Sequence, residues 1–142
     1  MPEATVGAFR NLWFHTGDAA IMDEQGDFYF VDRLGDRIRV RGENLSSFQV
    51  EDMLNGHPDV EFCAVFPIRA EEGDEDDIVV FAVPRAGVEL TREEIAVWAE
   101  GELPKFMRPR YVRVVDDIPR TPTNKVEKYK LRQQILAELG RT

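Results

Sequence analysis

The chain is 142 residues long, with 43% hydrophobic and 32% charged residues, a composition that suits one folded domain with a single core. Its formal net charge of −9 disfavours non-specific binding to nucleic acid. No apolar run approaches the roughly 18 residues of a membrane span, and no charged-then-apolar leader begins the chain, so we expect a cytoplasmic protein without a membrane span.

Two segments near the start predict strands. GDFYFVD at 26–32 and DRIRVRG at 36–42 are rich in β-forming residues, and they flank a short turn at Leu34 and Gly35. Further along, the apolar runs VEFCAVFPI and DIVVFAVPR predict central strands. The acidic run EEGDEDD at 71–77, between these runs, is typical of a solvated loop.

Three helices are expected, and capping boxes mark two of them. Ser46 followed by Gln49 begins one helix, and Thr91 followed by Glu94 begins another. The third covers about residues 126–139. The apolar anchors expected on the first and third helices are Phe48, Val50, Met53, Leu54, Tyr129, Ile135, Leu136 and Leu139. The order β-β-α-β-β-α-β-α predicts an α+β fold, a small β-sheet flanked by about three helices, with an N-terminal β-hairpin.

Candidate metal ligands and reactive thiols are few. The one cysteine, Cys63, lies in the apolar run EFCAVFPI, which favours a small buried thiol over a catalytic one. The two histidines, His15 and His57, have no paired spacing with each other or with Cys63. We therefore predict no zinc site, although a metal could arrive with a ligand.

Charge is distributed unevenly along the chain. Residues 1–104 carry 8 basic and 23 acidic side chains, whereas residues 105–142 carry 10 basic and 4 acidic ones. The basic end is where we expect an anion to bind, although a solvated basic helix would have the same composition.

Two short motifs in the first half carry groups suited to a nucleotide. HTGDAA at 15–20 places Asp18 on a glycine-flanked turn, a feature that is common by itself. VDRLGDRIRVRGEN at 31–44 places Arg33 at a strand end. The arginines that follow at every second position, which in a strand would share one face, are Arg37, Arg39 and Arg41. Carboxylates suit ribose hydroxyls and guanidinium groups suit phosphate or ribose oxygens, but such alternation is also typical of a solvated strand face.

A third motif presents a lysine on a loop. In PRTPTNKVEKYKL at 119–131, Pro122 fixes its own φ and pushes Thr121 toward an extended conformation, while Asn124 tolerates a left-handed backbone. Lys125 is therefore expected on a turn just before a helix. A mobile lysine there suits a developing negative charge.

The chain resembles the C-terminal domain of the adenylate-forming superfamily, which includes acyl-CoA synthetases, peptide-synthetase adenylation domains and beetle luciferases. The resemblance lies in three motifs, which occur in the order TGD, DRLGDRIRVRGENLSSFQVE and PRTPTNKVEKYKLR. The resemblance covers nearly the whole chain, and RGENLSSFQVE is most similar to acyl-CoA ligases near the crotonobetaine/carnitine-CoA ligase group. It implies the mobile lid of a larger acid-thiol ligase. Such an enzyme joins a carboxylate to AMP from ATP, releases pyrophosphate, and transfers the acyl group to coenzyme A.

The resemblance implies residue roles in the adenylation step. Asp18 would hold the ribose hydroxyls, Arg33 would also reach the ribose, and Lys125 would bridge the substrate carboxylate and the α-phosphate. Gly35 falls at the hinge, where the family usually has Asp or Lys, and Asn124 stands where it commonly has Gly. Glycine should ease rotation, and asparagine tolerates the left-handed region, so both departures are conformationally mild.

For the thioester step, the resemblance implies that VRGEN at 40–44 faces the active site after the lid rotates. Gly42 would leave room for the pantetheine arm, with Glu43 and Asn44 next to it in the motif. Arg39 sits where luciferase-like members carry a lysine that serves this step, but it could equally be a surface strand residue. No residue is assigned to the 3′-phosphate of coenzyme A.

The resemblance also divides the chain. Residues 1–34 would be the end of the large-domain segment with the ribose-binding strand region, and residues 35–142 the mobile lid. The phosphate loop, adenine site and acyl pocket belong to the large N-terminal domain, which is the expected partner, so we expect this chain alone to be inactive. The expected ligands are a carboxylic acid that the sequence does not identify, ATP or AMP, and coenzyme A, with Mg²⁺ bound mainly by the other domain.

Two alternatives remain open. An adenylation domain that loads a carrier-protein pantetheine would share all three motifs, although the end of the chain at AELGRT, without a linker, argues against it. The other alternative is a noncatalytic module in which this domain is a free binding protein, or a single-stranded nucleic-acid binder that would use the basic tail with Phe106, Tyr111 and Tyr129. The net charge of −9 opposes nucleic-acid binding.

Overall fold

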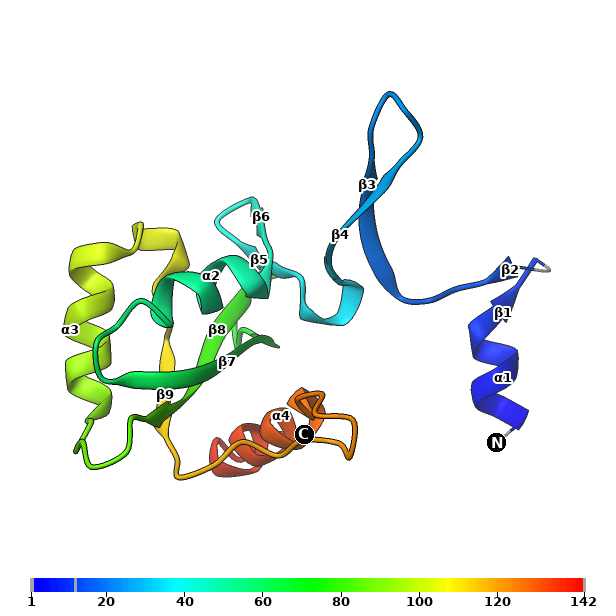
Figure 1. Cartoon of the computed structure of the whole chain (residues 1–142). Coiled ribbons are helices and arrows are strands. Elements are labelled where there is room, and N and C mark those ends of the chain that lie inside the picture. Colours follow the sequence, from blue (N-terminus) through cyan, green and yellow to red (C-terminus); the bar gives the residue numbers. More distant parts are fainter. Residues whose placement is uncertain (1, 12, 142) are drawn as a thin grey trace. The chain divides into compact units, whose positions relative to one another are not determined.

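The computed structural model describes residues 2–11 and 13–141, which divide into two compact units, Met1–Gly35 and Asp36–Thr142 (Figure 1). The division falls inside a short 3₁₀ helix, η1 (Leu34–Asp36). In the described part of the chain, no helix has the length and apolar character needed to cross a bilayer.

The first unit consists of a short helix and two hairpins. The helix α1 (Pro2–Ala8) precedes β1 (Phe9–Arg10) and β2 (Trp13–Phe14), which pair with each other. The longer hairpin pairs β3 (Asp18–Met22) antiparallel with β4 (Phe28–Arg33). An N-terminal hairpin is present as expected, but β4 pairs with β3 and not with the predicted strand at 36–42. The strand β3 was missed, because DAAIM has too few β-branched or aromatic residues to predict a strand locally.

The second unit contains a small hairpin, a mixed sheet and the three expected helices. The hairpin strands are β5 (Ile38–Val40) and β6 (Glu43–Leu45). The sheet strands are β7 (Val60–Arg69), β8 (Asp76–Pro84) and β9 (Tyr111–Val114). The helices are α2 (Ser47–Leu54), α3 (Arg92–Glu102) and α4 (Lys128–Glu138), with a 3₁₀ turn η2 (Lys105–Met107). Within the described residues, β8 is the central strand, antiparallel to β7 and parallel to β9. The predicted α+β class is confirmed.

Side chains of the sheet alternate between two cores. Cys63 and Val65 of β7, with Val80 of β8, belong to a core that α2 and α3 complete. Phe66 and Phe81 belong to the opposite core, which α4 covers (Figure 1). Because successive strand residues point to opposite faces, a sheet covered on both sides needs nearly continuous apolar strands. This explains the two apolar runs in the sequence.

Both predicted capping boxes are present. Gln49 Oε1 accepts a hydrogen bond from the N–H of Ser46 at 3.1 Å, and Glu94 Oε2 accepts one from the N–H of Thr91 at 2.8 Å. Caps of this kind typically stabilise a helix by about 1 kcal/mol. The start of each helix was therefore readable from its first four residues.

Two of the expected helix anchors are wrong. Phe48 is 63% exposed and Tyr129 is 54% exposed. The buried residues of α2 include Val50 and Leu54, which are four positions apart, so Phe48, two positions before Val50, lies on the other side. In α4 the buried residues are Leu131, which the sequence analysis missed, and Ile135.

The acidic run is only partly a solvated loop. Residues 71–75 are exposed as expected, but β8 begins at Asp76, and Asp77 is 8% exposed. Asp77 Oδ1 lies 3.2 Å from Nη1 of Arg110, the residue just before the neighbouring strand β9. The Asp77 carboxylate is thus paired with a guanidinium at the start of β8.

Cys63 is buried as predicted. Its burial, together with the nearby Glu51 carboxylate, raises the pKa of the thiol from 9.0 to about 12. His57 is also buried, and its Nδ1 accepts the N–H of Asp59 at 3.1 Å. Across the described residues, no group of three or more His, Cys, Asp or Glu side chains could hold a metal ion.

Candidate functional site

Asp18 and Arg33 form an ion pair across the long hairpin of the first unit. They are register partners in β3 and β4, and Arg33 Nε lies 2.9 Å from Asp18 Oδ1. Gly17 precedes the pair with a φ of +77°, and its carbonyl accepts the N–H of Leu34 at 2.8 Å. The side chains of Arg33 and Asp18 remain 57% and 31% exposed, so a ligand can reach both.

Gly35, the expected hinge residue, lies in η1 with a φ outside the left-handed region. A Cβ at this position would meet no other atom within 4 Å. The described conformation therefore does not itself require glycine. Asp36, which follows, is held by two cations of α4, with Lys128 Nζ at 3.6 Å and Arg132 Nη2 at 3.5 Å.

Arg41 and Gly42 form the two-residue turn between β5 and β6. Their φ angles are +53° and +78°, and a positive φ at both central positions defines the type I′ turn that matches the strand twist. The positive φ, and not a lack of space, accounts for glycine at position 42, because a Cβ there would meet no atom within 4 Å. The expected strand face of Arg37, Arg39 and Arg41 is wrong, because β5 covers only Ile38–Val40.

The other residues expected for the thioester step lie on the same hairpin. Arg39 and Asn44 are register partners, and the side chains of Arg39, Glu43 and Asn44 are exposed. The backbone N–H of Arg39 donates to Asp76 Oδ2 at 2.8 Å, which connects β5 to the start of β8. The hairpin is thus attached to the sheet while the side chains of these three residues face solvent.

Lys125 lies on a tight loop just before α4, as predicted. Arg120 and Val126 form an isolated antiparallel bridge, and the N–H of Thr121 donates to the Lys125 carbonyl at 2.8 Å. The Thr121 hydroxyl accepts the N–H of Lys125 at 3.1 Å, and Asn124 has a φ of +64°. The Lys125 side chain is exposed, and its ammonium has no hydrogen bond or ion pair within the described residues. Its catalytic role stays a prediction.

A partly buried ion cluster follows the lysine loop, and the sequence analysis missed it. Lys128 Nζ lies 2.9 Å from Glu51 Oε1 and donates to Ser47 Oγ at 3.0 Å, while Glu51 Oε1 accepts the N–H of Val65 at 2.8 Å. The side chains of Lys128 and Glu51 are only 17% and 18% exposed. The one available signal was helical spacing, since Lys128 precedes the buried Leu131 by three positions.

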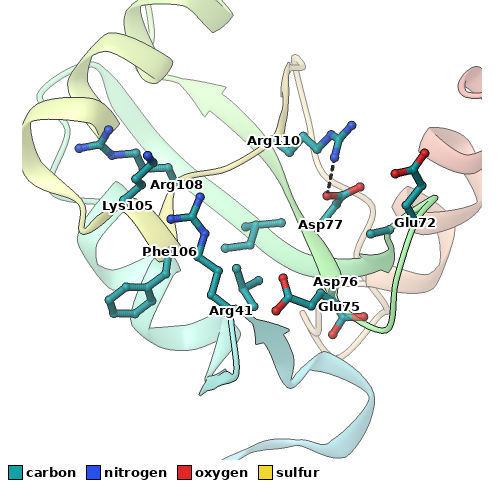
Figure 2. Close-up of a pocket in the computed structure, with 12 residues that line it drawn as sticks. Arg41, Glu72, Glu75, Asp76, Asp77, Lys105, Phe106, Arg108 and Arg110 are labelled. Atoms are coloured by element: carbon teal, nitrogen blue, oxygen red, sulfur yellow. Dashed lines mark hydrogen bonds and ion pairs between the residues drawn. The ribbon is translucent and has the colours of Figure 1, made fainter.

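A cavity of about 270 Å³ lies beside the Arg41–Gly42 turn (Figure 2). Its charged lining residues are Arg41, Glu72, Glu75, Asp76, Asp77, Lys105, Arg108 and Arg110. In Figure 2 the guanidinium of Arg41 points toward Lys105 and Arg108, which makes one end of the cavity basic. An anion was expected at the basic tail, but the sequence alone did not identify these residues.

The rest of the lining is already partly paired. The Asp77 carboxylate raises the pKa of the Arg110 guanidinium above its ordinary value. Arg108 donates to the carbonyls of Leu103 at 3.1 Å and Glu100 at 2.7 Å, which fixes its guanidinium without neutralising the charge. Arg108 is thus a cation at the basic end whose position is fixed by hydrogen bonds.

Residues 49–125 match the AMP-binding enzyme C-terminal domain family, and the chain belongs to that family. It is 37% identical over 132 residues to crotonobetaine/carnitine–CoA ligase of Salmonella arizonae, covering 92% of this chain and 25% of that protein. It is also 37% identical over 133 residues to feruloyl-CoA synthase of an Amycolatopsis species, covering 94% of this chain and 27% of that protein.

The fold is likewise similar to a solved structure. ATP-bound MatB from Rhodopseudomonas palustris matches with a TM-score of 0.77 and 29% identity, covering 94% of this chain and 27% of that one. The chain thus spans about a quarter of the length of these relatives. The family resemblance of the three sequence motifs is confirmed.

Proposed function

We propose that this chain is the lid domain of an AMP-forming acyl-CoA synthetase. In the first reaction a carboxylate oxygen attacks the α-phosphorus of ATP, giving acyl-AMP as pyrophosphate leaves. In the second, the thiol of coenzyme A attacks the acyl carbon, giving acyl-CoA as AMP leaves. The observation that carries the proposal is the exposed ammonium of Lys125, without a partner in the described residues, on a loop fixed by backbone hydrogen bonds.

Lys125 would act in the first reaction. As the carboxylate attacks phosphorus, negative charge develops on oxygens that water would otherwise solvate. An ammonium already free of other partners can bridge the carboxylate and the α-phosphate without first breaking an ion pair. The backbone bonds of Thr121 to Lys125 would keep the base of the side chain in place during that step.

Asp18 and Arg33 would bind the ribose of the nucleotide. A carboxylate accepts hydrogen bonds from two neighbouring hydroxyls, and the guanidinium at 2.9 Å can donate to a ribose oxygen. Their exposure of 31% and 57% leaves room for such a ligand. The pairing in the hairpin would orient both groups before ATP binds.

The β5–β6 hairpin would serve the second reaction. Arg39, Gly42, Glu43 and Asn44 would lie along the pantetheine arm, and the cavity next to the turn offers a basic end for the phosphates of coenzyme A. The three cations at that end are Arg41, Lys105 and Arg108. Bringing Lys125 and this hairpin to one active site in turn would require rotation about Gly35.

The exposed apolar surface of the first unit supports the proposal that a large N-terminal domain is the partner of this chain. The exposed large apolar residues of this unit are Val6, Phe9, Trp13, Phe14, Ile21, Met22, Phe28, Tyr29, Phe30, Val31 and Leu34. So many exposed apolar side chains in about 35 residues are typical of a surface that another part of a protein covers. That domain would also supply the acyl pocket and most ligands of the Mg²⁺ that accompanies ATP.

The test uses the full-length enzyme that contains this chain. With a panel of carboxylic acids, we expect substrate-dependent ATP–pyrophosphate exchange, followed by thioester formation with coenzyme A. Lys125→Ala should slow the exchange by about 10²-fold, the usual effect of losing one preorganised electrostatic group, and should affect thioester formation from supplied acyl-AMP much less.

The matched control is Lys130→Ala, which removes an exposed lysine of α4 that pairs with Glu127 at 2.6 Å. It should leave both reactions within about twofold of the unmodified enzyme. Equal losses in the two reactions for Lys125→Ala would make the lysine structural. Absence of exchange with every acid would contradict the proposed function itself.

A carrier-protein pantetheine remains the second candidate acceptor, because its phosphopantetheine arm would use the same hairpin. It lacks the adenosine 3′-phosphate of coenzyme A, so the basic cavity end would matter less for it. We therefore expect Arg108→Ala to raise the KM for coenzyme A several-fold. An unchanged KM would favour the carrier protein.

A further inference from the structure

We propose that Arg120 is a positioning residue for Lys125, acting through Asn124 and Phe62. The inference rests on the proposed role of Lys125 in adenylation. The residue before the lysine is asparagine, where the family resemblance leads one to expect glycine.

Asn124 has a φ of +64°, a conformation that glycine adopts freely and that asparagine adopts more readily than other residues. Its N–H donates to the carbonyl of Thr121 at 2.8 Å, which closes the turn. Its side-chain Oδ1 accepts a hydrogen bond from Arg120 Nη1 at 3.1 Å. Glycine could satisfy the backbone but could not make this second contact.

Arg120 is itself held against the sheet. Its guanidinium carbon lies 4.4 Å from the centre of the Phe62 ring, within the range of a cation–π contact. Phe62 belongs to β7 and packs against the core that α4 covers. The guanidinium therefore lies over a ring of the sheet and also donates to the turn, an arrangement that lysine cannot reproduce.

The clamp matters because, among the described residues, the other hydrogen bonds of the loop tip run between Thr121 and residues 123–125, so they close the turn without attaching it to the sheet. Pro122, Thr123, Asn124 and Lys125 are all exposed. The backbone bridge of Arg120 to Val126 fixes the base of the loop, whereas the Arg120–Asn124 contact fixes the residue whose carbonyl carbon is bonded to the Lys125 nitrogen. Losing it should let the lysine occupy several positions, and displacements near 1 Å can cost about 10²-fold in rate.

The experiment is a double-mutant cycle in the full-length enzyme. Arg120→Ala removes the clamp from one side, and Asn124→Gly removes it from the other while keeping the left-handed turn. For each single variant we expect the kcat of adenylation to fall about tenfold, with the KM for ATP and the rate of thioester formation from supplied acyl-AMP within about twofold. Because both remove the same contact, the double variant should be no slower than the slower single variant.

Arg120→Lys should restore little, whereas the control Arg92→Ala, on α3, should leave adenylation unchanged. Hydrogen exchange should become at least fivefold faster in a peptide covering residues 121–125 and stay unchanged in β7. Multiplicative losses in the cycle, equal losses in both reactions, or unchanged exchange at the loop would each overturn the role of Arg120. A failure of the proposed function would look different, because the unmodified enzyme would then show no exchange of pyrophosphate, or Lys125→Ala would have no effect.

Discussion

At the scale of single residues, two lysines three positions apart have opposite surroundings. Lys125 is exposed, and its ammonium has no partner among the described residues, whereas Lys128 is 17% exposed and contacts Glu51, Ser47 and Asp36. The first arrangement leaves a charge available to a ligand, and the second uses a charge to connect α4 with α2 and the start of the second unit. Only the contacts distinguish the two roles.

Lys128→Met should destabilise the fold. The substitution keeps most of the aliphatic stem but leaves the Glu51 carboxylate, 18% exposed, without its ion-pair partner, so we expect the free energy of unfolding to fall by about 1–3 kcal/mol. Urea unfolding of this chain measures the change. Lys130→Met, on the same helix at an exposed ion pair, should change stability by less than about 0.5 kcal/mol. Equal effects of the two substitutions would show that the cluster contributes nothing beyond a surface pair.

The raised pKa of the buried Cys63 thiol predicts a loss of stability at high pH. Its pKa is raised from 9.0 to about 12 mainly by burial, so above pH 9 the unfolded chain releases the thiol proton while the folded chain keeps it. Stability is therefore retained below pH 9 and should fall by about 2 kcal/mol between pH 8 and about pH 10.5 from this group alone. The measurement compares unfolding of the unmodified chain and Cys63→Ala at both pH values. The same pH dependence in the two would contradict it.

At the scale of elements, the short helix η1 is where we expect the lid to pivot. Gly35→Pro would fix φ near −65° and remove a backbone donor, so it should restrict rotation while leaving Asp18 and Arg33 chemically intact. In the full-length enzyme we expect pyrophosphate exchange to persist and most thioester formation from isolated acyl-AMP to be lost.

The matched control is Gly35→Ala. Because a Cβ there meets nothing within 4 Å and φ is not left-handed, alanine should be tolerated in the described conformation. Loss of thioester formation with alanine as well would indicate that the rotated conformation, which serves the thioester step, requires backbone angles that only glycine adopts. A proline variant that folds and forms thioester at the unmodified rate would place the pivot elsewhere.

Elements with local signals were predictable, and those defined by pairing were not. The starts of α2 and α3 follow from side chains within four residues of each cap, and β7 and β8 follow from long apolar runs. The strands β3 and β6 were missed, because short strands of small or polar residues are held by their partners. The segment 36–42 was predicted too long, because Asp36 lies in η1 and Arg41 and Gly42 form a turn.

At the scale of the whole molecule, the chain spans about a quarter of the length of its relatives. We therefore expect it, isolated, to fold but not to release pyrophosphate from ATP with any of a panel of carboxylic acids. Pyrophosphate release by the purified 142-residue chain is the measurement, with the full-length enzyme as the positive control. Substrate-dependent release well above the blank would show that this chain contains a complete adenylation site.

The candidate site was predictable where its chemistry is local. The turn that presents Lys125 depends on Thr121 and Asn124, which lie within four residues of it, so the sequence alone determined that feature. The sequence likewise determined the family, because three motifs occur in one order along the chain. Short-range hydrogen bonds and motif order need no knowledge of the fold.

Only the tertiary structure decided which distant groups meet. Asp18 and Arg33 are brought to 2.9 Å by the register of β4 with β3, a strand and a pairing that the sequence did not predict. Lys128 reaches a serine 81 residues away, and Arg120 stacks on Phe62, because packing of α4 and its preceding loop against the sheet sets those distances. Side-chain identity limits which contacts are chemically possible, but backbone register and packing choose among them, and that choice involves elements too far apart in the chain for local patterns to encode.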